Sequence, residues 1–194
     1  MDSILRYIED MSFYMVIILP VIIIIRIFQI IKSEKKTRVF RELGIILFFM
    51  FLTGLLSQTI LPAVSIQGGS IKLINGDHQA INLEPFRVIF ETYNAIKYLN
   101  LWQPFFINFV GNIVMFIPIG VLLPLLWKRF DRAWRTIGTG FLLSVCIELL
   151  QLPQMRSSDV DDLWLNTLGA SIGYILYKKF PNNFKKSFNR KQAG

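Results

Sequence analysis

The chain has 194 residues, 53% of them hydrophobic, and a mean hydropathy of +0.48. Soluble domains have an apolar share of roughly 45 to 50% even when glycine is counted, so this composition favours a protein that resides in a lipid bilayer. The formal net charge of +8 does not indicate a nucleic-acid partner, because the basic residues lie in short runs between apolar segments. Cys146 is the single cysteine, which excludes an internal disulfide and a cysteine-based metal site.

Several apolar segments are long enough, or nearly long enough, to cross a bilayer as helices of roughly 20 residues. They are residues 12–31, 39–61, 108–127, 136–152 and 163–177. We therefore predict an all-α integral membrane helical bundle with about five transmembrane helices.

The basic residues predict how this bundle is oriented. Short loops rich in lysine and arginine remain in the cytoplasm, and three such segments occur, at residues 32–41, 128–135 and 178–191. Five crossings place all three on one side, with the N-terminus outside and the C-terminus in the cytoplasm. The phenylalanines interleaved in the basic tail suit an anionic leaflet, so membrane lipids are expected partners.

Residues 62–107 are too polar to span the membrane. Alternation around Asn75 and Gly76, a pair favoured in type I′ turns, predicts a small extracellular hairpin over roughly residues 65–83. The apolar residues after Pro85 recur at helical spacing and predict an amphipathic helix along the outer interface. The chain thus divides into an N-terminal two-helix segment (1–61), the hairpin and interfacial helix (62–107), a three-helix core (108–177) and a basic cytoplasmic tail (178–194).

Glu148 is the polar residue with the strongest functional signal. It lies at least one turn inside an apolar segment, where ionisable groups are costly and mark a functional site by default, and a helix presents it on the same face as Gln151. In the following loop, Arg156 either neutralises Glu148 or offers its planar guanidinium to a carboxylate or phosphate of a ligand. Asp159 either shares a helix face with Asp162 or caps that helix.

The candidate ligand-binding residues all fall on the predicted outer side of the membrane. They are Asn112, Glu148, Gln151, Arg156, Asp159, Asp162 and Asn166. A structural interpretation, in which these acids form ion pairs and helix caps, stays open beside the functional one. Because His78 is isolated next to a predicted turn, we expect neither a metal site nor a cofactor.

The segments NFVGNIVMFIPIG, IELLQ and RSSDVDDLWLNTLGASIG, together with the upstream NLEPF, resemble the VanZ-like membrane proteins over roughly residues 82–177. The family pattern also includes positions to which we assign structural roles, namely Asn82, Pro85, Phe86, Phe116, Pro118, Gly120, Gly169 and Gly173. The resemblance implies a bacterial cell-membrane protein, in a family whose founding member is linked to low-level resistance to the glycopeptide teicoplanin. It brings no catalytic assignments.

Three hypotheses follow from these patterns. In the first, an outward-facing polar pocket engages a lipid-linked cell-wall precursor or a lipoglycopeptide. In the second, the protein is an enzyme on envelope lipids with Glu148 as a general base, although the sequence supplies no obvious nucleophile. In the third, the polar residues hold the helices together in a structural or accessory membrane protein.

Overall fold

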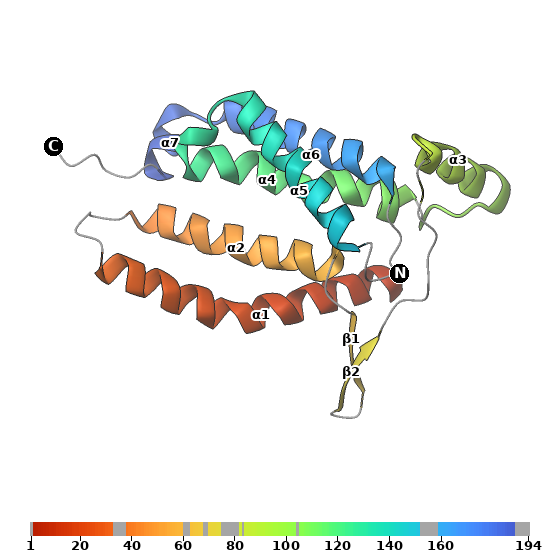
Figure 1. Ribbon diagram of the computed structural model, residues 1–194, viewed down its shortest axis with the longest axis horizontal. Coiled ribbons are helices and arrows are strands. Elements are labelled where there is room, and N and C mark those ends of the chain that lie inside the picture. Colours follow the sequence, from red (N-terminus) through yellow and green to blue (C-terminus); the bar gives the residue numbers. More distant parts are fainter. Residues whose placement is uncertain are drawn as a thin grey trace.

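The computed structural model describes residues 2–32, 38–59, 63–67, 70–74, 82, 84–103, 105–151 and 159–188. Long helices running side by side make up most of this part of the chain, and a small hairpin and a short helix project near one end (Figure 1). The predicted all-α helical membrane bundle is thereby confirmed.

The bundle has two layers. The helices α1 (Asp2–Ile31) and α2 (Val39–Thr59) pack against each other in one layer, and the other contains α4 (Gly111–Leu126), α5 (Ala133–Gln151) and α6 (Val160–Lys179) (Figure 1). The helix α2 lies between α1 and the second layer, so α1 contributes least to the core.

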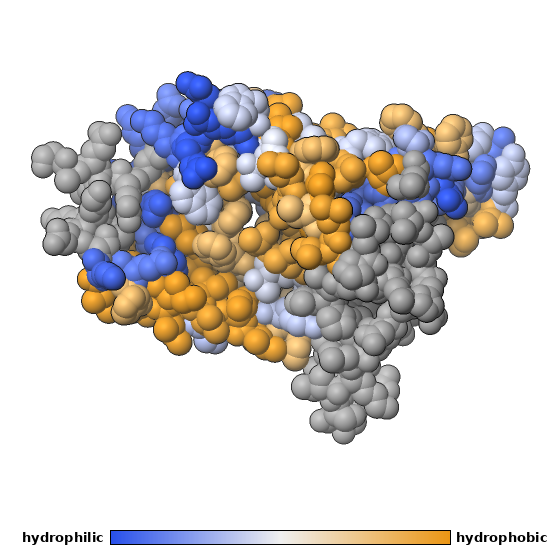
Figure 2. All heavy atoms as spheres, in the orientation of Figure 1, coloured by the Kyte–Doolittle hydropathy of each residue, from blue (hydrophilic) through white to orange (hydrophobic). Residues whose placement is uncertain are grey.

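Four of these helices are long and apolar enough to cross a membrane: Met11–Ile31, Val39–Ser57, Phe105–Leu126 and Ala133–Gln151. Their hydrophobic surface covers much of the length of the molecule (Figure 2). The helix α6 has 20 residues, which span about 30 Å at 1.5 Å per residue. Because α6 begins with two aspartates and ends with two lysines, its crossing of the membrane, the fifth that we predicted, stays a prediction.

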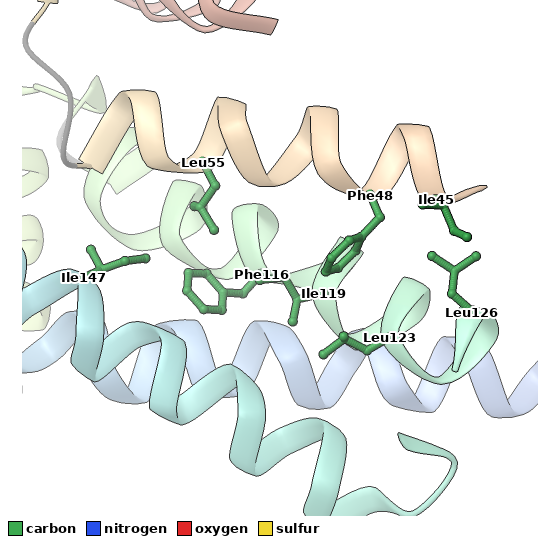
Figure 3. Packing of buried hydrophobic residues seen from close by; sticks show 8 residues of the cluster. All are labelled: Ile45, Phe48, Leu55, Phe116, Ile119, Leu123, Leu126 and Ile147. Atoms are coloured by element: carbon green, nitrogen blue, oxygen red, sulfur yellow. The ribbon is translucent and has the colours of Figure 1, made fainter. Parts of the chain in front are cut away.

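A hydrophobic cluster joins the two layers. Ile45, Phe48 and Leu55 of α2 point toward Phe116, Ile119, Leu123 and Leu126 of α4, and Ile147 of α5 closes one end (Figure 3). Phe116 is 1% exposed. Between membrane helices, close van der Waals packing stabilises the contact, because lipid is as apolar as these side chains, so this cluster fixes α2 against α4.

The helices α4 and α6 touch through their backbones. A Cβ atom on Gly169 would lie 2.1 Å from the carbonyl oxygen of Ile113, and one on Gly173 would lie 2.1 Å from that of Ile117. On α4, a Cβ atom on Gly120 would lie 2.1 Å from the carbonyl oxygen of Ala170 of α6. Small residues permit such contacts between membrane helices, so these glycines set the distance between α4 and α6.

The segment between α2 and α4 differs in part from the prediction. Its hairpin pairs β1 (Ala63–Gln67) with β2 (Ser70–Ile74), and Gln67 lies opposite Ser70. A small hairpin is thus present, but its predicted bounds, residues 65–83, and its predicted turn at Asn75 and Gly76 are wrong, because the described strands turn between Gln67 and Ser70; Asn75 and Gly76 lie outside the described residues. The amphipathic helix is present as α3 (Arg87–Leu99), which projects from the bundle (Figure 1).

The apolar face of α3 points away from the bundle. Its buried residues are Val88 and Thr92, whereas Phe90 is 68% exposed and Tyr93 is 55% exposed. This exposure fits a helix that rests on a membrane surface. After α3, a π-helical turn, Phe105–Val110, leads into α4.

The two ends of the bundle differ in chemistry. At one end, here called the basic end, α4 and α6 finish next to the turn η2 (Lys128–Phe130) and the helix α7 (Asn182–Phe188). The described basic residues of all three predicted cytoplasmic segments lie at this end (Figures 1 and 2). At the opposite end, here called the polar end, α5 finishes, α6 begins and α3 projects.

Candidate ligand-binding site

The polar end is built around the start of α6. Asp159 precedes the helix in an extended conformation, and its side chain accepts a hydrogen bond from the backbone N–H of Asp161 at 2.9 Å. Of the two interpretations left open by the sequence, Asp159 is therefore the helix cap, which satisfies one of the backbone donors in the first turn.

Asp159 also joins three segments that are distant in the sequence. Its side chain accepts a hydrogen bond from Asn82 Nδ2 at 2.9 Å, and the N–H of Val160 donates to the carbonyl oxygen of Asn82 at 3.2 Å. Its own backbone N–H donates to Glu148 Oε2 at 3.0 Å. The end of α5, the start of α6 and the chain before α3 are thus held together at one residue.

Asp161 is fully buried, and both of its carboxyl oxygens accept hydrogen bonds. Its carboxyl oxygens accept hydrogen bonds from the backbone N–H groups of Phe86 at 2.5 Å and Val88 at 2.7 Å, and from Trp164 Nε1 at 2.8 Å. Phe86 has a positive φ of 65° and gives α3 no side-chain cap of its own. A carboxyl group from α6 therefore caps the N-terminus of α3 and fixes its position on the bundle.

The candidate residues deeper in the bundle also contact one another. Glu148 is 9% exposed, and its carboxyl group lies next to that of Asp162. This contact joins the end of α5 to the first turn of α6. Asn112 Nδ2 donates to Asp162 Oδ1, which connects the pair to α4.

Asn166 lies one turn further along α6 and is 5% exposed. Its amide nitrogen donates to Ser144 Oγ at 2.9 Å, but its amide oxygen has no hydrogen-bond partner among the described residues. Gln151 shows the same pattern, because its nitrogen donates to the carbonyl oxygen of Thr59 at 2.8 Å and its oxygen has no described partner. Buried polar atoms without partners are uncommon in folded proteins.

The predicted site is thus largely brought together at one end of the molecule. Asn112, Glu148, Asp159 and Asp162 form one connected set, Asn166 approaches it through Ser144, and Gln151 contacts α2. Arg156 lies outside the described residues. Asn82 and Phe86 belong to the same network through Asp159 and Asp161, and Pro85 is exposed beside them.

The sequence analysis did not include Asp161, Ser144 or Trp164 in the site. Acids are common in the first turn of any helix, so its position alone does not mark Asp161 as part of the site. The available signal was that Asp159 can act as the cap, which leaves Asp161 free to bond elsewhere. Trp164 follows three residues later, within reach of Asp161 on the same helix face.

The acceptors at this end of the bundle include carboxyl oxygens of Glu148, Asp159 and Asp162 and the amide oxygens of Gln151 and Asn166. Among the described residues, no group of histidine, cysteine, aspartate and glutamate has the geometry of a metal site. Acceptors of this kind match a ligand that presents ammonium, hydroxyl or amide N–H groups.

These features define a polytopic helical membrane protein with a buried carboxyl and amide cluster at one end of its bundle. A family model described as VanZ/LLP1 matches residues 43–181, which include most of α2 and the whole polar end. The chain belongs to this family, as its sequence motifs predicted. No curated protein and no solved structure matches the chain.

Proposed function

We propose that this protein contributes to glycopeptide resistance, such as resistance to teicoplanin, or to homeostasis of the bacterial envelope, by engaging a lipid-linked or lipopeptide ligand at its polar end. The observation that carries the proposal is the buried polar cluster at the end of a membrane bundle, with two amide oxygens, of Gln151 and Asn166, that lack partners among the described residues. A ligand that donates hydrogen bonds to these atoms would satisfy them.

The surface beside the polar cluster supports an amphipathic ligand. Phe90 of α3 is 68% exposed, and Trp102 and Phe106 in the segment that follows are each 52% exposed. An acyl chain would pack against these aromatic side chains, while its polar head would reach the acceptors of the cluster. We retain Arg156 as the partner for an anionic part of the head.

The proposal requires the polar end to face outward and the basic end to face the cytoplasm. The gathering of lysine and arginine at one end supports this orientation by the positive-inside rule. Single cysteines at Lys97 and at Arg132, in a Cys146→Ser background, provide a matched pair of exposed positions at opposite ends. A membrane-impermeant maleimide should label Lys97→Cys in intact cells and Arg132→Cys only after permeabilisation, and the reverse pattern would contradict the orientation.

The test of function is the susceptibility of a deletion strain to teicoplanin and vancomycin, complemented with wild-type or Glu148→Gln protein. The glutamine keeps an oxygen that can accept the hydrogen bond from Asp159 N–H, and its amide can donate to Asp162, so these contacts can be kept while the acidic group is removed. We expect wild type to restore teicoplanin tolerance and the variant to fail at equal membrane abundance. Equal restoration by both proteins would overturn the assignment of Glu148.

A structural role is the second candidate, and the buried Asp161 favours it. Its three hydrogen bonds hold α3 on the bundle and need no ligand. In a purely structural protein, loss of tolerance would follow loss of stability in every variant. We therefore compare Glu148→Gln with Asp161→Asn, because only the ligand-binding proposal predicts a variant that is stable and yet inactive.

A further inference from the structure

A cavity of about 490 Å³ lies at the basic end, far along α5 from the polar cluster. It is lined by Arg129, Phe130, Trp134, Arg135, Gly138, Thr139 and Leu142, which belong to η2 and the first half of α5. Its volume falls within the range of small-molecule sites, roughly 300 to 1,000 Å³.

The polar groups of this cavity are concentrated at one end of it. The guanidinium carbon of Arg129 lies 5.1 Å from the ring centroid of Phe130, and that of Arg135 lies 5.1 Å from the ring centroid of Trp134. Arg135 Nη1 also donates to the carbonyl oxygen of Arg129 at 2.9 Å. These contacts orient both guanidinium groups. Because each guanidinium has five N–H donors, most of these donors are still available to a ligand.

The charge of these arginines is not neutralised nearby. Within the part of the chain that the structure describes, ion pairs join Arg26 and Arg41 to Glu42, Arg87 to Glu91 and Lys178 to Asp131, and none involves Arg129 or Arg135. The neighbouring Asp131 turns toward Lys178 and Tyr177 instead. The rim of the cavity is therefore suited to an anion.

The cavity becomes apolar along the helix. From Arg135 to Leu142 the helix advances by about 10 Å, at 1.5 Å per residue, and both residues lie in the segment Ala133–Gln151 that is apolar enough to span a membrane. Trp134 is 68% exposed and Leu142 is 62% exposed, and a Cβ atom on Gly138 would have no neighbour within 4 Å. Open space thus continues from the arginines toward the hydrocarbon region.

We propose that this cavity binds one anionic phospholipid of the surrounding leaflet. Its phosphate contacts Arg129 and Arg135, and the upper part of one acyl chain lies beside Gly138 against Trp134 and Leu142. Charge at headgroup depth and open apolar space below it match the lengthwise polarity of a phospholipid. The site is independent of the ligand proposed for the polar end.

The test measures the affinity of purified full-length protein for phosphatidylglycerol and for phosphatidylcholine with the same acyl chains, by native mass spectrometry. Wild type should prefer phosphatidylglycerol, and the double variant Arg129→Gln/Arg135→Gln should weaken its binding by about tenfold or more. Arg132→Gln is the control for the two single variants Arg129→Gln and Arg135→Gln, because each of the three removes one positive charge and Arg132 does not line the cavity. It should change the affinity by less than about twofold.

A second pair of variants leaves the charge unchanged. It tests lipid binding in the cavity even if the arginine variants fold poorly. Gly138→Ala adds one methyl group in open space, and Gly138→Leu places a much larger side chain in the cavity. Leucine and alanine have similar helix propensities, so the two variants differ mainly in the volume of the side chain. Only the leucine variant should lose phosphatidylglycerol binding. Equal binding of both lipids, equal effects of all the arginine variants, or full binding by Gly138→Leu would each overturn the proposal.

Discussion

The two ends of the bundle use polar residues in opposite ways. At the polar end, Asp161 is fully buried and its carboxyl group accepts three hydrogen bonds. At the basic end, the ion pair of Lys178 with Asp131 is 47% and 51% exposed. Interactions between buried groups are costly to break, whereas exposed ion pairs contribute little. The polar end therefore holds α3 on the bundle, and the basic end interacts mainly with its surroundings.

The largest expected effect is that of Asp161→Asn. An amide nitrogen in place of one carboxyl oxygen would face a backbone N–H donor and leave it unsatisfied in a buried site. We expect the free energy of unfolding to fall by about 3 kcal/mol, measured by titration with a denaturing detergent.

Asp162→Asn is the control for this variant. Its amide oxygen still accepts the hydrogen bond from Asn112, so the loss should stay below about 1 kcal/mol. Equal losses for the two variants would mean that Asp161 has no special part in holding α3.

A smaller loss is expected for Asn82→Ala. This change removes the hydrogen bonds from Nδ2 to Asp159 and from the N–H of Glu84 to Oδ1, but it keeps the backbone bond from Val160. The expected loss is about 1 to 2 kcal/mol, with faster hydrogen exchange in the first turn of α3. Unchanged exchange there would show that Asp161 alone positions this helix.

The smallest effect is expected at the basic end, from Asp131→Asn. Burial raises the pKa of Asp131, but hydrogen bonds from Lys178 and Tyr177 and the charges of Lys178 and Lys185 outweigh it, so the pKa lies below its ordinary value. A lowered pKa adds stability above the unfolded value of about 3.9, which is lost as the pH falls through the folded pKa. Thermal unfolding between pH 6 and pH 3 should show a slightly weaker pH dependence in the variant, and a strong effect at pH 6 would contradict the assignment of an exposed pair.

Much of the membrane architecture could be predicted from the sequence, because long apolar segments and clustered basic loops reflect local composition. The predicted segment 39–61 corresponds to α2, and 136–152 corresponds to α5, within a few residues at each boundary. The hairpin was misplaced because Asn75-Gly76 has a local turn preference, and the pairing of Gln67 with Ser70 completes the strands earlier. A local turn preference does not determine which residues of two strands pair with each other.

The candidate site was only partly predictable for a different reason. Glu148 could be identified because an acid within an apolar helix is conspicuous at any position. The role of Asp161 depends on the N–H groups of Phe86 and Val88, which lie 75 and 73 residues away in the chain. Neither helical spacing nor a local motif reveals a contact over such a separation.

The central claim is that the polar end binds a ligand in addition to holding the fold, and thermal stabilisation of the purified protein tests it most directly. A ligand that binds only the folded state raises the melting temperature. We expect teicoplanin or a lipid-linked cell-wall precursor to raise the melting temperature of wild type and to have little effect on Glu148→Gln, whose melting temperature without ligand should match that of wild type. No shift with either compound, or the same shift in both proteins, would contradict the claim and leave the polar cluster with a structural role.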